Sequence, residues 1–276
     1  MNVKPLRVAV VSALALMVAA CSDSPDPLAQ DTRPAEQIFA EADARLLEGD
    51  PAAAAALYDD VERLYPYSQL ARLAMLRAAQ SYYAAGDYTE ARLAAERFLS
   101  FYPADPQAPA AQLLIANTHY DQITDVGRDQ RATREAMAAL RETIVRYPGT
   151  DEAREAQLKL DLTMDHLAGK EMEVGRFYLK NGHHGAAINR FRTVVEEYQT
   201  TSQVPEALHR LVESYMILGV VDEAQTAAAV LGYNYPGSPW YAASFDLLTG
   251  SNTAPRLHSN SWMARIYRQV IRGEWL

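Results

Sequence analysis

A Tyr-Pro dipeptide occurs four times in this chain, and three of the copies follow a glycine and an alanine-bearing amphipathic stretch. Glycine adopts the left-handed backbone conformation that ends many helices, and proline cannot continue a helix because it lacks an N–H. Alanine lets two helix backbones approach closely. The recurrence therefore predicts short helices joined in pairs by tight turns. The dipeptides are Tyr65-Pro66, Tyr102-Pro103, Tyr147-Pro148 and Tyr235-Pro236, and the glycines are Gly49, Gly86 and Gly219.

The spacing of these residues matches the tetratricopeptide repeat, a helix-turn-helix unit of about 34 residues. In the clearest unit, Tyr82 closes the first helix and Gly86 makes the turn. Ala91 then lies at the helix crossing, and Pro103 stops the second helix. We predict an all-α fold, a tetratricopeptide-repeat superhelix of about five helix-turn-helix repeats with a C-terminal capping helix. The matching residues are Gly49, Ala54 and Pro66 in the first unit, Tyr178, Gly182 and Ala187 in the fourth, and Tyr215, Gly219, Ala224 and Pro236 in the fifth.

The units depart from this pattern at three places. Arg45 stands in the tyrosine position of the first unit, and Gln199 stands in the proline position of the fourth. In the third unit the interval from Tyr120 to Ala136 is 16 residues, against 9 in the second, fourth and fifth units. The extra residues include the polar, glycine-containing segment 124–129, which predicts an enlarged loop. The pattern agrees equally well with two interpretations, a loop that carries function and an insertion that the fold tolerates.

Residues 151–180 contain no glycine-proline break, and their apolar residues recur at roughly helical spacing. We predict one long helix there, whose second half is the first helix of the fourth repeat. Repeats one to three then occupy residues 35–150, and the long helix, repeats four and five and the capping helix occupy residues 151–248. Residues 249–276 are predicted to form a loop and a short basic amphipathic helix, which either folds back onto the repeats or contacts a partner or a membrane. The apolar residues of the long helix are Leu158, Leu162, Leu167, Met172 and Phe177.

Residues 1–20 have the pattern of a secretion signal, with a short basic start and an apolar run that is too short to span a bilayer. The run ends in Val18-Ala19-Ala20-Cys21, which resembles the lipobox of bacterial lipoproteins. Because Cys21 is the only cysteine, we predict that it carries a covalent lipid; the alternative is an ordinary signal peptide with Cys21 as a bystander. Residues 21–34 are predicted to form a flexible tether, since they contain prolines and aspartates and little apolar surface.

The residues that carry chemistry form no pattern typical of an enzyme or a metal site. One cysteine excludes an intramolecular disulfide and a cysteine-based zinc site. The six histidines show no H-x-x-x-H spacing, and no nucleotide-binding or hydrolase motif is present. The net charge is −9, and it becomes more negative when a leader with Lys4 and Arg7 is removed, which argues against nucleic-acid binding. We expect no catalysis, no metal and no cofactor besides the covalent lipid at Cys21.

Two tyrosines lie outside the positions that the repeat pattern assigns to the core. The chain has 16 tyrosines against 6 phenylalanines, and many of the tyrosines occupy those core positions. Tyr67 and Tyr83 do not, and tyrosines on a concave helical surface suit peptide binding. Packing between repeats is the alternative for each residue. Both are therefore candidate substrate-peptide-binding residues.

Six strings carry a more specific likeness than the repeat pattern. Together with the lipobox, the tether and the long helix, they make nearly the whole mature chain resemble the BamD family, lipoproteins of the outer-membrane β-barrel assembly machine. The strings are YPYS at 65–68, YDQI at 120–123, DVGRDQ at 125–130, DHLAGKEMEVG at 165–175, AINRF at 187–191 and PEAL at 205–208.

The resemblance implies a non-enzymatic scaffold that is lipid-anchored to the outer membrane and faces the periplasm. Ser22, after the lipidated cysteine, is similar to the outer-membrane sorting pattern. The implied partners are the periplasmic domains of the barrel-forming subunit, other accessory lipoproteins and unfolded outer-membrane proteins. By this resemblance, repeats one and two, in the substrate-receiving half, would hold the substrate. Asn189 and Arg190, in the partner-binding half, would contact the barrel-forming subunit.

Two alternatives remain beside this interpretation. Arg190 suits a planar ion pair with a partner carboxylate, but a surface or intrachain ion pair is the ordinary role of such a residue. A periplasmic repeat scaffold for envelope division or peptidoglycan organisation is the competing function. A scaffold of that kind is expected to lack the BamD-like strings around Asn189 and Arg190, whereas this chain contains them. An enzyme would need a polar, convergent pocket that no motif here supplies.

Overall fold

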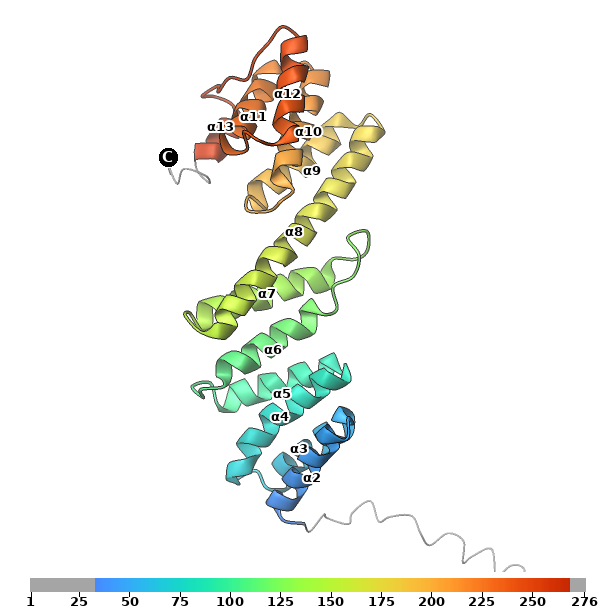
Figure 1. The fold of residues 1–276 in the computed structure, drawn as a ribbon, viewed down its shortest axis with the longest axis vertical. Coiled ribbons are helices and arrows are strands. Elements are labelled where there is room, and N and C mark those ends of the chain that lie inside the picture. Colours follow the sequence, from blue (N-terminus) through green and yellow to red (C-terminus); the bar gives the residue numbers. More distant parts are fainter. Residues whose placement is uncertain (1–32, 269–276) are drawn as a thin grey trace, which may run out of the picture.

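The computed structural model describes residues 33–268, and this range contains helices and no strand (Figure 1). The helices follow one another in an elongated stack, from α2 at one end to α12 and α13 at the other (Figure 1). The prediction of an all-α fold is confirmed. The helices are α2 (Ala35–Leu47), α3 (Pro51–Leu64), α4 (Gln69–Ala85), α5 (Tyr88–Phe101), α6 (Ala108–Tyr120), α7 (Arg131–Arg146), α8 (Asp151–Lys180), α9 (His184–Glu197), α10 (Val204–Ile217), α11 (Val221–Asn234), α12 (Pro239–Gly250) and α13 (Trp262–Ile266).

Each helix up to α11 packs mainly against the next one in the chain, which gives the five predicted helix pairs from α2–α3 to α10–α11. The helix α12 packs against α10 and α11 and caps the last pair. In the described residues, the first helices of neighbouring repeats also contact each other, α2 with α4, α4 with α6 and α6 with α8. The second helices α3, α5 and α7 make at most marginal contact with one another. The first helices therefore line the inner face of this part of the stack.

Left-handed glycines end the first helix in four of the repeats. At Gly86, the N–H of the next residue, Asp87, donates to a carbonyl in the last turn of α4 at 2.9 Å, which satisfies one of the carbonyls left free at a helix end. A side chain would strain this conformation, so glycine is the residue that the turn needs. The predicted turns are thus confirmed. The four glycines are Gly49, Gly86, Gly182 and Gly219, with φ from 74° to 84°.

The alanines predicted at the helix crossings are all completely buried. Ala136 keeps this position even though the insertion precedes it, so the inserted residues do not change the packing of α6 against α7. The predicted register of the repeats is confirmed in all five units. The crossing residues are Ala54, Ala91, Ala136, Ala187 and Ala224, each with 0% exposure.

Replacing Ala91 by leucine is expected to lower the free energy of unfolding by about 1–3 kcal/mol, because the larger side chain overpacks a closed crossing between α4 and α5. Thermal unfolding followed by circular dichroism measures the change. Thr89→Leu introduces the same side chain at an exposed position of the same helix and should have little effect. Equal melting temperatures for Ala91→Leu and the unmodified chain would contradict the assigned register.

Local contacts replace the two consensus residues that are missing. In the first repeat, the Arg45 guanidinium pairs with Glu48 at 3.1 Å near the end of α2. In the fourth repeat, the side-chain amide of Gln199 donates to the backbone carbonyl of Glu196 near the end of α9. This hydrogen bond satisfies a helix-end carbonyl at the place where other repeats stop the helix with proline.

The helix α8 has 30 residues, as predicted for residues 151–180, and it joins two groups of repeats. Of the five apolar residues whose spacing predicted the helix, Leu167 and Met172 are buried, whereas Leu158, Leu162 and Phe177 are more than 60% exposed. The apolar spacing therefore does not mark one continuous buried face. The reason is that the neighbouring helices α6, α7 and α9 cover only part of the surface of α8.

The C-terminal segment folds back onto the fourth and fifth repeats. The indole N–H of Trp262 donates to Glu196 of α9 at 2.8 Å, and the guanidinium of Arg192 lies 3.9 Å from the centre of its ring. Met263 is 1% exposed, and α13 packs against α11. Of the two predicted alternatives, folding back is confirmed up to residue 268. The rest of the predicted terminal helix, in residues 269–276, lies outside the described residues.

The predicted leader, Cys21 and most of the tether also lie outside the described residues. Lipidation of Cys21 therefore stays a prediction. In the part of the chain from 33 to 268, no helix combines the length and the apolar character that a bilayer crossing needs.

Candidate protein-binding surfaces

Asn189 and Arg190 lie on the exposed side of α9. The other side of this helix is buried, with Ala187, Phe191 and Val194 completely enclosed. These apolar residues recur every three to four positions and face α8 and α10, so the two polar residues between them point outward. The amphipathic pattern of α9 thus presents both predicted partner-binding residues to solvent.

Arg190 already has a carboxylate partner within the chain. Its guanidinium donates to Glu171 of α8 at 3.0 Å, which is the intrachain ion pair that sequence reasoning left open. The Arg190 side chain is still 45% exposed. It has five N–H donors, so a second carboxylate can reach the guanidinium from solvent. Next to it, Tyr178, Asn189 and Thr193 line a hollow of about 190 Å³.

A glycine sets the distance between α8 and α9. A Cβ atom on Gly175 would lie 2.4 Å from Cε1 of Phe191, which is closer than carbon atoms approach each other. The ring of Phe191 has no exposed surface and is enclosed by other core residues, so it has little room to move away. Gly175 therefore permits the close packing that brings Glu171 and Arg190 within ion-pair distance.

We expect Gly175→Ala to lower the free energy of unfolding by about 1–2 kcal/mol, because overpacking against Phe191 outweighs the gain of about 1 kcal/mol in helix propensity. Chemical denaturation measures this difference. Gly185→Ala is the matched control, since a Cβ there meets no atom within 4 Å. That control is expected to leave stability unchanged or to raise it. Stabilisation by both alanines would contradict the close approach of the helices.

The two candidate tyrosines lie at opposite ends of α4 and cannot form one pocket, since about 20 Å of helix separates them. Tyr67 precedes α4 and is fully exposed. Tyr83, in the last turn, donates its hydroxyl to the carboxylate of Asp121 and packs against Tyr88 with ring centres 5.7 Å apart. Burial, and then the bond to Asp121, raise the pKa of Tyr83. Tyr83 thus makes a contact between repeats, whereas Tyr67 is exposed to solvent, and peptide binding by either tyrosine stays a prediction.

A hollow of about 480 Å³ lies beside Asp121, where the end of α6 and the inserted loop meet α8. Its walls combine aromatic, aliphatic and polar side chains, and Leu162 contributes an exposed apolar surface. Sequence reasoning missed this hollow as a site. The available signals were the insertion and the position of Leu162 in the apolar pattern of α8. The lining residues are Tyr120, Asp121, Ile123, Thr124, Leu162, Thr163 and His166.

The inserted loop docks onto the middle of α8. The ammonium of Lys170 donates to the backbone carbonyl of Gly127 at 3.2 Å. The methyl groups of Val126 lie 3.8 Å from where a Cβ of Gly169 would stand, so they contact the helix at its glycine. Gln130 is buried, and its side-chain amide donates to two carbonyls of the loop. The insertion is thus an ordered part of the junction between the two repeat groups.

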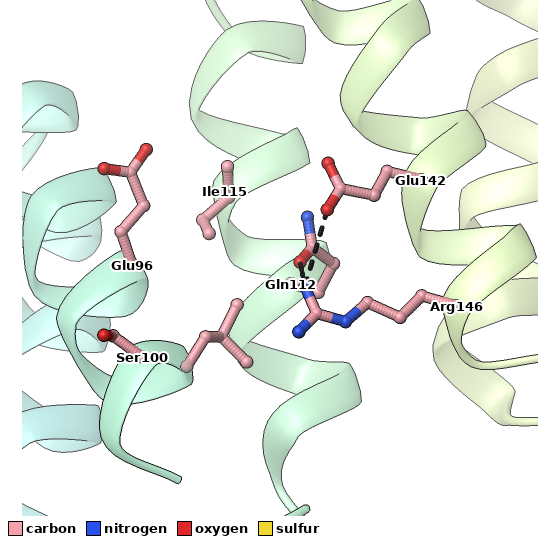
Figure 2. A pocket seen from close by; sticks show the side chains of 7 residues that line it. Glu96, Ser100, Gln112, Ile115, Glu142 and Arg146 are labelled. Carbon is pink, nitrogen blue, oxygen red and sulfur yellow. Dashed lines mark hydrogen bonds and ion pairs between the residues drawn. The ribbon is translucent and has the colours of Figure 1, made fainter. Parts of the chain in front are cut away.

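A further hollow of about 370 Å³ lies between α5, α6 and α7 (Figure 2). Arg146 extends into it from α7, with one guanidinium nitrogen 3.5 Å from the side-chain oxygens of Gln112 and Glu142. Glu96 and Ser100 lie on the opposite wall (Figure 2). These contacts connect neighbouring repeats and do not assemble a nucleophile with a base. Among residues 33–268, no three His, Cys, Asp or Glu side chains gather in a way that would hold a metal ion.

The family of this chain is shown by the similarity of its sequence to known proteins. A model of the outer membrane lipoprotein family YfiO matches residues 31–231, which is most of the chain. The chain belongs to this family. The match begins just before α2 and ends in α11, so it includes the inserted loop, the long helix and the Arg190 surface of this family member.

Relatives of this chain carry the name outer membrane protein assembly factor BamD. The protein of Caulobacter vibrioides is 46% identical, over 83% of this chain and 75% of its own length. That of Rickettsia prowazekii is 44% identical, over 67% of this chain and 73% of its own length. The protein of Neisseria meningitidis serogroup A is 32% identical, over 86% of this chain and 93% of its own length.

Proposed function

We propose that this chain is an outer-membrane protein assembly factor, which holds unfolded barrel proteins and couples them to the barrel-forming subunit. The observation that carries this proposal is the 46% identity to an assembly factor over 83% of the chain. The family match favours this function over a scaffold for envelope division. An assembly factor of this kind works by binding, which agrees with a stack of helices that offers exposed surfaces.

The first repeats are assigned the binding of unfolded barrel proteins, the substrate. Tyr67 is fully exposed at the start of α4, where an extended peptide can stack on its ring. The hollow that Leu162 and Tyr120 help to line lies further along the chain, in the third repeat and α8. An unfolded barrel protein exposes alternating apolar side chains, and a hollow of this size, with Leu162 and Ile123 in its walls, accommodates one of them.

The fourth and fifth repeats are assigned the binding of the barrel-forming subunit, with Asn189 and Arg190 as contacts. An exposed ion pair such as that of Arg190 with Glu171 contributes at most about 1 kcal/mol. A carboxylate on the partner can therefore replace Glu171 at little cost. Other accessory lipoproteins of the complex are further partners, and the lipid on Cys21 is the anchor that holds the chain at the outer membrane, facing the periplasm.

The test is purification of the tagged, lipidated chain in mild detergent, with co-purifying proteins identified by mass spectrometry. The proposal predicts recovery of a large outer-membrane barrel that carries periplasmic domains. Recovery of cell-wall or division proteins without such a barrel would contradict it and favour the scaffold function.

A further inference from the structure

Two arginines on the exposed side of α7 have no ion-pair partner among residues 33–268. Arg134 and Arg141 are both exposed, and no carboxylate lies within ion-pair distance of either. On the same helix, Arg131 and Arg146 each pair with a glutamate four positions away. The two unpaired guanidiniums are thus free to meet charges on another molecule.

The two arginines lie on one stripe of the helix, which we call the α7 surface. A separation of seven residues is about two helical turns, so their Cα atoms are about 10 Å apart along the same face. Between and beyond them, Ala138 is exposed and Val145 is 79% exposed. The α7 surface therefore offers two positive charges separated by small and apolar side chains.

Helices α7 and α9 both pack against α8, the helix that joins the two repeat groups. Burial raises the pKa of Tyr198, which directly follows α9; Glu197 and Glu171 add to the rise, and Arg134 and Arg141 oppose it. The charges of both guanidiniums thus act on this hydroxyl. Glu171 lies on α8, against which both α7 and α9 pack, and it is the ion-pair partner of Arg190, so the α7 surface lies on a helix next to the surface assigned to the barrel-forming subunit.

We propose that the α7 surface binds an acidic segment of a protein partner, with Arg134 and Arg141 each pairing one carboxylate. The chain as a whole carries a net charge of −9 and repels acidic partners, so an unpaired positive pair gives such a segment a defined place to dock. Carboxylates about 10 Å apart match it, as at two positions seven residues apart on one face of a helix. This proposal rests on the proposed function, because it extends the Arg190 surface.

The test compares two double variants of the lipidated chain in detergent. Arg134→Glu with Arg141→Glu removes the positive pair, and Arg63→Glu with Arg154→Glu makes the same change in net charge at exposed arginines elsewhere. Circular dichroism verifies that both remain helical. The ligands are the purified periplasmic domains of the barrel-forming subunit and a helical peptide with two glutamates seven positions apart. A peptide with glutamines at those positions is the control.

The Arg134 and Arg141 double variant is expected to bind both ligands at least about tenfold more weakly, and the control variant within about twofold of the unmodified chain. Equal weakening in both double variants, or none in either, would overturn the proposal. Weaker binding of the barrel-forming subunit in Arg190→Glu, with unchanged binding in the Arg134 and Arg141 double variant, would also overturn it while leaving the proposed function in place. If the unmodified chain binds the acidic peptide through these arginines but not the barrel-forming subunit, the α7 surface stands and the proposed function fails. Arginine-dependent binding to phosphatidylglycerol vesicles without peptide binding would overturn the proposal in favour of a lipid surface.

Discussion

Arg190→Glu is expected to weaken binding of the barrel-forming subunit by about ten- to a hundredfold while leaving the helix content unchanged. The new carboxylate would stand beside Glu171, where the guanidinium now donates at 3.0 Å, and would repel an acidic group of the partner. Because both side chains are partly exposed, they can turn apart into solvent, so the loss falls on binding rather than on folding. Affinity for the purified periplasmic domains, with circular dichroism in parallel, measures the two effects.

Two further variants separate a contact with the partner from a role within the chain. Glu171→Gln frees Arg190 from its intrachain ion pair, and this variant should bind at least as tightly as the unmodified chain. Exchanging the charges, with Glu171→Arg and Arg190→Glu together, restores the ion pair in reverse. If the exchange also restores binding, Arg190 acts by joining α8 to α9, and its assignment as a partner contact is wrong.

Cys21→Ala is expected to move the chain from the membrane fraction to the soluble fraction of the periplasm. Each buried methylene of a lipid anchor contributes about 0.8 kcal/mol, so several chains on one cysteine hold a protein firmly and their loss releases it. Cell fractionation, with incorporation of labelled palmitate, follows the anchor directly. Persistent membrane binding of a chain without lipid would show that protein contacts also hold it there.

Ser22→Asp is the matched control, because it leaves Cys21 available for lipidation. By the resemblance to lipoprotein sorting, this variant should keep its lipid and fractionate with the inner membrane. A chain with aspartate at this position that reached the outer membrane unchanged would contradict the sorting assignment, although the anchor itself would stand.

The features that were predictable from the sequence are those fixed by the local backbone. A left-handed turn needs a residue without a side chain, so Gly86 and Gly219 mark the ends of their helices directly. A close crossing needs a small residue, so Ala91 and Ala224 give the register of the repeats. The long helix was predictable in the same way, because no residue between 151 and 180 ends it.

The features that were not predictable depend on residues far apart in the chain. The insertion was visible as extra residues, but its docking depends on Lys170 and Gly169, some 40 positions away. Tyr83 was a candidate for peptide binding, and the bond that occupies its hydroxyl comes from Asp121 in the next repeat. Spacing along one helix also did not distinguish Leu162, which is exposed, from Leu167, which is buried, because the neighbouring helices decide what is covered.

The most direct test of the assembly function measures the folded fraction of an outer-membrane barrel in cells depleted of this chain, by its mobility in electrophoresis with and without heating. The account predicts that the folded fraction falls on depletion, returns when the unmodified chain is supplied, and does not fully return with Arg190→Glu. Normal amounts of folded barrel during depletion, together with a defect in division or cell shape, would contradict it.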